Sequence, residues 1–244
     1  MSLDQTLMEV EPIFRDGAFV MPSFQESLTA LQIVEELKSG ELSCDDILSI
    51  VTERKSYTLT YGAYKKGILI FKDNYKRIFL FLSQLMPDAS PLFCLLIQEF
   101  QRIGAELEKG VLDYDDVVNH NSAYTLFTDG IYFIAEVVPH ANVDEQTKDG
   151  TVHLLGSLFD LQCDKPLLHR KKNEYIINLL DEIGGKRIIP PLRKMCGCLG
   201  VDVWSTGNFY DSTGFNPTHD LEEWYAADRE RIEAIIKKHE PKKC

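Results

Sequence analysis

The feature that most constrains the fold of this chain is a strongly marked apolar helix signal between Pro91 and Lys109. Ser90 stands where an N-cap belongs, Pro91 suits the first turn of a helix, and Gly110 follows where a helix commonly ends. The centre of the segment, 92–97, is apolar on nearly all sides. Because a helix of this kind must be surrounded by protein, we expect it to be the central buried helix of a helical fold.

Similar signals recur along the chain. Ser43 and Asp46 have the spacing of a capping box, as do Ser23 and Glu26, and Gly40 stands between the two segments where a helix would stop. Apolar residues at helical spacing follow these and later start signals. We therefore expect helices over about 23–39, 43–51, 91–109, 113–127, 142–161, 164–183 and 218–236. The fold class predicted is mainly α, a single multi-helix globular domain.

Two segments fit either a helix or a strand. In 56–81, Tyr57, Leu59 and Tyr61 alternate as in a strand, whereas the residues from Ile68 onward follow a helical period. A hairpin over 68–81 is the alternative. Segment 129–138 either continues the preceding helix or forms a short strand. The fold alternative is therefore α+β, with a small β element.

The positions of prolines and glycines indicate how the chain is organised. Residues 1–20 are interrupted by Pro12 and Gly17 and are expected to be irregular, followed by a single mainly helical domain over 21–239 and a frayed tail over 240–244. Segment 186–216 contains Pro190-Pro191 and several glycines. We expect it to be the least regular part of the domain and a functional loop region.

Net charge excludes some classes of function. The chain of 244 residues has a formal charge of −12, which argues against general nucleic-acid binding. Charges interrupt every apolar stretch well before 18 residues, so we expect no membrane span. The N-terminus has no secretory signal pattern, and the six scattered cysteines favour reduced thiols. The expected location is the cytoplasm.

A basic island over residues 165–194 stands out against this acidic background. It contains eight basic and three acidic side chains, so its charge is +5 in a chain of −12. Charge segregated in this way is typical of a surface that contacts an anionic group. Guanidinium groups suit bidentate binding of phosphate or carboxylate, and neighbouring cations favour a neutral imidazole at His169. The candidate anion-binding residues are Arg170, Lys171, Lys172, Arg187 and Arg193.

Two small motifs offer candidates for chemistry. Asp116 and His120 are four residues apart in a predicted helix and share one face, as an acid–base pair or two metal ligands would. Together with His169 they are the candidate catalytic residues. Cys196 and Cys198 form a CxC pair, which suits a soft metal or a strained disulfide, although no second pair accompanies it.

These patterns lead to one preferred function and two alternatives. We expect a binding or regulatory protein without a catalytic signature, whose partner is a protein or a small anionic ligand. One alternative is an enzyme acting on a small anionic substrate through Asp116, His120 or His169. The other is a metal-binding or cofactor-binding helical protein, which requires His120, His140 and His153 to converge. The sequence specifies no cofactor and no oligomeric state.

Overall fold

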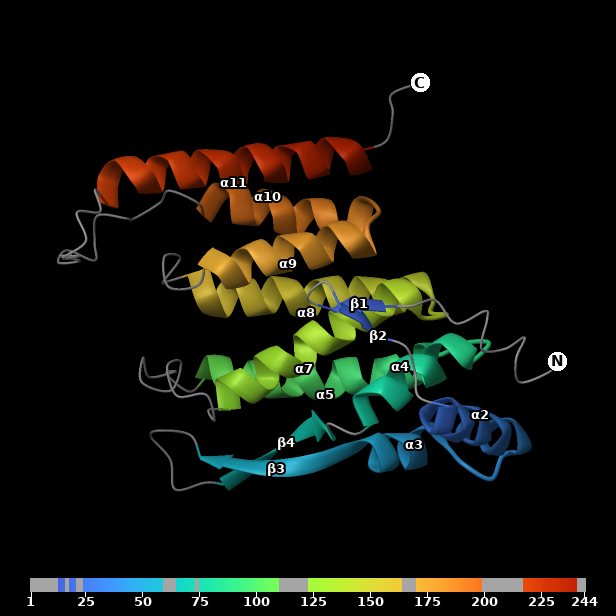
Figure 1. The fold of residues 1–244 in the computed structure, drawn as a ribbon. Helices are drawn as coiled ribbons and strands as arrows, with labels where there is room; N and C mark the ends of the chain where they lie inside the picture. The colour runs from blue at the N-terminus through green and yellow to red at the C-terminus, as the bar shows by residue number, and fades with distance from the viewer. Residues whose placement is uncertain are drawn as a thin grey trace. The chain divides into compact units, whose positions relative to one another are not determined.

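A computed structural model describes residues 13–15, 18–20, 24–58, 65–72, 75–109, 123–163, 170–198 and 217–240 (Figure 1). These residues form two compact units, unit 1 over Met1–Leu154 and unit 2 over Leu155–Cys244. The fold is mainly α with small β elements, as the sequence predicts. None of the helices in the described ranges has the length and apolar character needed to cross a lipid bilayer.

Unit 1 begins with a short hairpin and two helices. Strands β1 (Ile13–Arg15) and β2 (Ala18–Val20) pair antiparallel, so the prediction of an irregular segment over 1–20 is wrong for these residues. They are followed by α2 (Phe24–Ser39) and α3 (Cys44–Val51). Gly40, with φ of +78°, ends α2 as expected. The capping box of α3 is also confirmed, because the Asp46 N–H donates to Ser43 Oγ and the Ser43 N–H donates to Asp46 Oδ2.

A β-hairpin follows, in the first of the two segments that the sequence left open between helix and strand. Strand β3 (Thr52–Thr58) pairs antiparallel with β4 (Lys65–Phe71), in a register that places Thr52 opposite Phe71. The strand alternative therefore holds up to Phe71, and the helical one from α4 (Lys76–Leu85) onward. Ile68 and Phe71 are both buried. Two buried residues three positions apart are also compatible with one face of a helix. Hydrogen bonding to β3 stabilises the strand conformation instead.

The remaining helices of unit 1 are α5 (Ser90–Lys109), α7 (Ala123–Val137), the short η2 (Val138–His140) and the first part of α8 (Glu145–Cys163). Segment 129–138 is thus helical. Helix α5 packs on α3 and α7, and α7 also packs on β4. Four phenylalanine rings form the centre of the core, at Phe71, Phe79, Phe93 and Phe133. The expected central burial of α5 is confirmed, since Leu92, Phe93 and Leu96 are 0 % exposed.

Polar contacts hold the turns of unit 1. The Asn142 side-chain amide donates to the carbonyl oxygens of Gln84 and Met86, at 2.9 and 3.0 Å. The next turn is fixed by Asp144, whose backbone N–H donates to Ser90 Oγ at 2.8 Å. Asp144 then accepts from the Thr147 N–H at 2.7 Å, which caps the start of α8. The α4–α5 turn is therefore tied to the start of α8 by side chains rather than by apolar packing alone.

Unit 2 contains the end of α8, then α9 (Arg170–Ile183), η3 (Lys186–Ile188), α10 (Ile189–Cys198) and α11 (Pro217–His239). Gly184 and Gly185, with φ of +68° and +78°, end α9 as predicted. Helix α11 packs on α9 and α10. Helix α11 continues to His239. Residues 241–244 lie outside the described ranges, and the single domain expected over 21–239 stays a prediction.

Part of the segment predicted to be irregular is helical. Residues 186–198 form η3 and α10, whereas 199–216 lie outside the described ranges. The two prolines that suggested a loop are Pro190 and Pro191, which occupy the first turn of α10. Proline is tolerated there because the first N–H groups of a helix have no partner within the helix. The proline pair therefore marks a helix start instead of a loop.

Candidate protein-binding groove

The end of α11 is fastened to the turn after α9. His239 Nδ1 accepts from the Gly185 backbone N–H at 3.2 Å, and its Nε2 donates to Asp181 Oδ1 at 2.9 Å. Lys238 Nζ donates to the same carboxylate oxygen at 2.8 Å. A Cβ built on Gly184 would lie 3.2 Å from the His239 ring, so glycine at this position leaves room for the ring. These contacts fix the C-terminal turn of α11 against α9.

Further ion pairs join the helices of unit 2. Arg231 of α11 donates to Glu174 at 3.1 Å and also to Asn178, both on α9. Lys194 of α10 lies 2.6 Å from an Asp160 carboxylate oxygen on α8. Arg193 of α10 donates to Glu240 at 2.9 Å. Two members of the basic island, Arg193 and Lys194, are therefore paired with acids of this chain.

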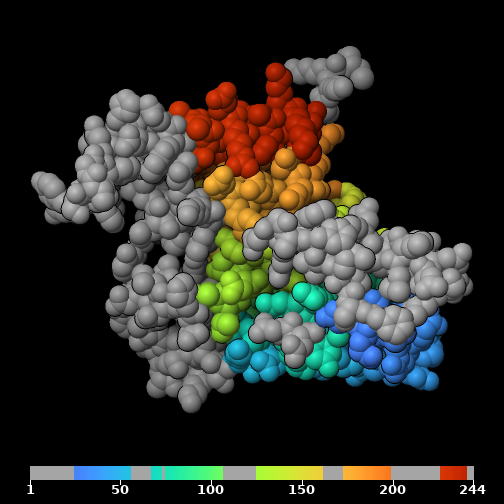
Figure 2. Space-filling model, viewed as in Figure 1, coloured from blue at the N-terminus to red at the C-terminus, as the bar shows by residue number. Residues whose placement is uncertain are grey.

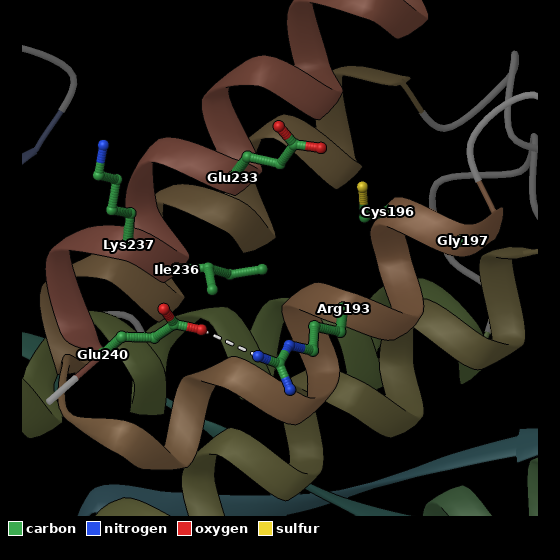
Figure 3. A pocket seen from close by; sticks show the side chains of 7 residues that line it. All are labelled: Arg193, Cys196, Gly197, Glu233, Ile236, Lys237 and Glu240. Carbon is green, nitrogen blue, oxygen red and sulfur yellow. Dashed lines mark hydrogen bonds and ion pairs between the residues drawn. The ribbon is translucent and has the colours of Figure 1, made fainter. Parts of the chain in front are cut away.

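A groove remains between α10 and α11, with a volume of about 560 Å³. Figure 3 shows the Ile236 side chain in the middle of it, with the Arg193–Glu240 ion pair near one end. In the space-filling view of Figure 2, the red surface of α11 borders on the orange surface of α9 and α10. The residues that line the groove are Arg193, Cys196, Gly197, Glu233, Ile236, Lys237 and Glu240.

The lining combines an apolar floor with charged edges. Ile236 is half-buried, and a Cβ built on Gly197 would meet no atom within 4 Å, so the α10 side is open. The Cys196 thiol is free and half-buried. Glu233 and Lys237 are exposed, and neither has an ion pair within the described part of the chain. Apolar surface with charges around it is typical of a protein-binding surface.

The sequence candidates for catalysis fall outside the described ranges. Asp116, His120 and His169 all lie in undescribed segments. Helix α9 starts at Arg170 and includes Lys171 and Lys172, whose side chains are also outside the description. Arg187 is half-buried in η3, beside Gly185. Of the candidate anion-binding residues whose side chains are described, Arg193 lines the groove and Arg187 does not. The role of either residue in binding an anion stays a prediction.

The metal-binding candidates of the described ranges lie on η2, α8 and α10. Cys196 and Cys198 both lie in α10, and residues two apart on a helix do not face each other. His140 ends η2 and His153 is exposed on α8. Within the described ranges, no three His, Cys, Asp or Glu side chains are grouped as ligands of one metal ion.

Sequence reasoning missed the groove because its α11 residues were read as part of one apolar face. The helical spacing of Ile232, Ile235 and Ile236 suggests that all three face inward, but Ile236 is only half-buried while the other two are buried. Adjacent positions on a helix diverge by about 100°. The consecutive pair Ile235-Ile236 was therefore the available signal that one apolar side chain leaves the core.

We expect Asp181→Asn to destabilise unit 2 by about 1 kcal/mol or less at neutral pH, because a partly exposed ion pair contributes little. Burial raises the pKa of Asp181, but hydrogen bonds from Lys238 and His239 outweigh it and hold that pKa below its usual value. A depressed pKa contributes stability above the unfolded-state value and loses it as pH falls through the folded-state value.

The difference between wild type and Asp181→Asn should therefore shrink as pH falls below about 4. Urea unfolding of both proteins between neutral pH and the acid limit of folding measures it. A difference that grows on acidification would contradict the assigned contacts. Glu182→Gln, a change at an exposed acid of the same helix, provides the matched control.

Comparisons with protein-family models, curated proteins and solved structures give no significant match for this chain.

Proposed function

We propose that this chain is a non-catalytic binding or regulatory protein that contacts a protein partner through the α10–α11 groove. The observation that carries the proposal is the groove itself, in which half-buried Ile236 lies between charged edges. Its volume of about 560 Å³ is sufficient to receive several side chains of a partner. A helical segment suits an elongated depression between two helices, with its apolar side chains directed inward.

The charges of the groove support binding more than chemistry. Arg193 and Glu240 neutralise each other across the groove at 2.9 Å. The other charged residues at the edges of the groove, Glu233 and Lys237, are exposed. Exposed charges around an apolar centre steer a partner and select its orientation, whereas the apolar centre supplies most of the affinity. A site of this kind needs no cofactor.

Peptides are first selected from a displayed helical library for binding to the wild-type chain. We expect these peptides to bind the Ile236→Lys variant at least tenfold more weakly, because a charge replaces the apolar floor of the groove. That loss corresponds to about 1.4 kcal/mol. Binding is measured by fluorescence anisotropy, and circular dichroism checks that each variant is folded. Gly197→Phe, which fills the open α10 side, should weaken the same peptides, whereas Glu182→Lys on the exposed part of α9 should leave binding unchanged.

Selection that yields no binder, or only binders indifferent to both Ile236→Lys and Gly197→Phe, would overturn the proposal. A second readout locates the contact. Bound peptide should slow alkylation of Cys196, which lines the groove, as quantified by mass spectrometry of its tryptic peptide. Unchanged alkylation of Cys196 at saturating peptide would place the binding surface elsewhere.

A further inference from the structure

Among the described residues of α11, Glu233 and Lys237 are unpaired although several of their neighbours are paired. Arg231, Lys238 and Glu240 each make an ion pair with α9, α10 or the turn beside them. Glu233 and Lys237 make none within the described ranges. They are one helical turn apart in the order that favours an intrahelical pair, yet Figure 3 shows the two side chains turned away from each other.

The positions of these two charges are self-complementary. A two-fold axis perpendicular to α11 places two copies of the helix antiparallel when it passes at the level of residue 235, midway along the helix between 233 and 237. The axis lies on the side of the helix that carries Glu233 and Lys237, opposite to buried Ile235. Glu233 of one copy then lies opposite Lys237 of the partner subunit, and the reverse contact forms on the other side of the axis. Each contact occurs twice, as in every isologous dimer. The same arrangement covers Ile236, which is half-buried in the single chain.

We propose that the occupant of the α10–α11 groove is a second copy of this chain, whose α11 packs antiparallel along α11. The inference rests on the proposed function, since it names the partner of the same groove. Charge complementarity favours a second copy, because in the antiparallel arrangement the acid and the base of each helix lie opposite the base and the acid of the other. The exposed ion pairs set orientation, and burial of the groove floor drives association.

Charge exchange tests the inference in four proteins. Wild type should show a concentration-dependent monomer–dimer equilibrium in sedimentation velocity and native mass spectrometry. E233K places two lysine–lysine contacts in the homodimer and K237E two glutamate–glutamate contacts, so each variant should dimerise at least tenfold more weakly. An equimolar mixture of E233K and K237E restores opposite charges and should form a heterodimer. The double variant E233K/K237E should form a homodimer again.

Controls separate this contact from general charge effects. Glu182→Lys changes the net charge by the same amount as E233K, at an exposed residue that does not line the groove, and should dimerise like wild type. Circular dichroism establishes that E233K and K237E remain folded. Restoration in the mixture cannot arise from misfolding of either variant, because both chains must present intact α11 surfaces.

The outcomes distinguish this inference from the proposed function. Wild type that remains monomeric, or dimers insensitive to both single exchanges, would overturn the second-copy occupant. If library peptides still lose affinity for Ile236→Lys in that case, the groove remains a binding surface for another protein. If peptide binding is also indifferent to Ile236→Lys, both proposals fail.

Discussion

Phe79→Ala should destabilise unit 1 by about 3–5 kcal/mol, because a fully buried aromatic side chain is replaced by a methyl group. Phe79 is 0 % exposed. Its ring packs edge-on against Phe71 and Phe93, with centroids 5.0 and 5.3 Å apart. Such pairs add to the free energy gained from burial alone. A loss of this size is a large fraction of the stability of an ordinary domain.

Hydrogen exchange resolved by mass spectrometry is the appropriate measurement, because the two units need not unfold together. Protection should fall in α4 and α5 of unit 1 and persist in α9 and α11 of unit 2. Phe79→Leu, which retains part of the volume, should lie between wild type and Phe79→Ala. Wild-type protection of α4 and α5 in Phe79→Ala would show that the ring does not lie in the core.

Gly130→Ala should destabilise unit 1 by about 1–3 kcal/mol, although alanine is the better helix former. A Cβ at this position would lie 2.3 Å from Cζ and 2.5 Å from Cε1 of Phe100. Phe100 is 0 % exposed, and its ring packs on Phe127 with centroids 6.1 Å apart. The ring has no free space, so α5 and α7 must separate or the ring must leave its rotamer.

Gly156→Ala is the matched control for this prediction. Gly156 also lies in a helix, but a Cβ there would meet only Pro191, at 3.9 Å. We expect this change to be neutral or to stabilise by up to about 1 kcal/mol, which is the helix preference of alanine over glycine. Urea denaturation compares the two variants, and Phe100→Leu combined with Gly130→Ala should recover part of the loss. Equal stability of Gly130→Ala and Gly156→Ala would contradict the close approach of α5 and α7.

Elements with local signals could be predicted from the sequence. The capping box at Ser43 and Asp46, the stops at Gly40 and Gly184, and the apolar centre of α5 each depend on neighbouring residues alone. One boundary differs slightly, since Ser90 is the first residue of α5 rather than its N-cap. These helices could therefore be predicted from the sequence, because the residues that determine their ends and their burial are close together in the chain.

Elements that depend on distant residues could not be predicted in the same way. Strand β4 needs β3 as a hydrogen-bonding partner, and its Ile68 and Phe71 are equally compatible with a helix face. The groove depends on the packing of α10 on α11 and on the ion pair between Arg193 and Glu240, which are 47 residues apart. Charge counting found the basic island but could not show that its members pair with acids of the same chain.

The alkylation rate of Cys196 measures directly whether a protein chain covers the groove. Cys44 of unit 1 is the internal reference, a thiol whose pKa is raised by burial and by the nearby carboxylates of Asp45 and Asp88. In wild type, the rate of Cys196 relative to Cys44 should fall as protein concentration increases, whereas in E233K it should remain at the value of the dilute protein. A constant ratio, equal in wild type and E233K at all concentrations, would contradict a second copy of this chain as the occupant of the α10–α11 groove.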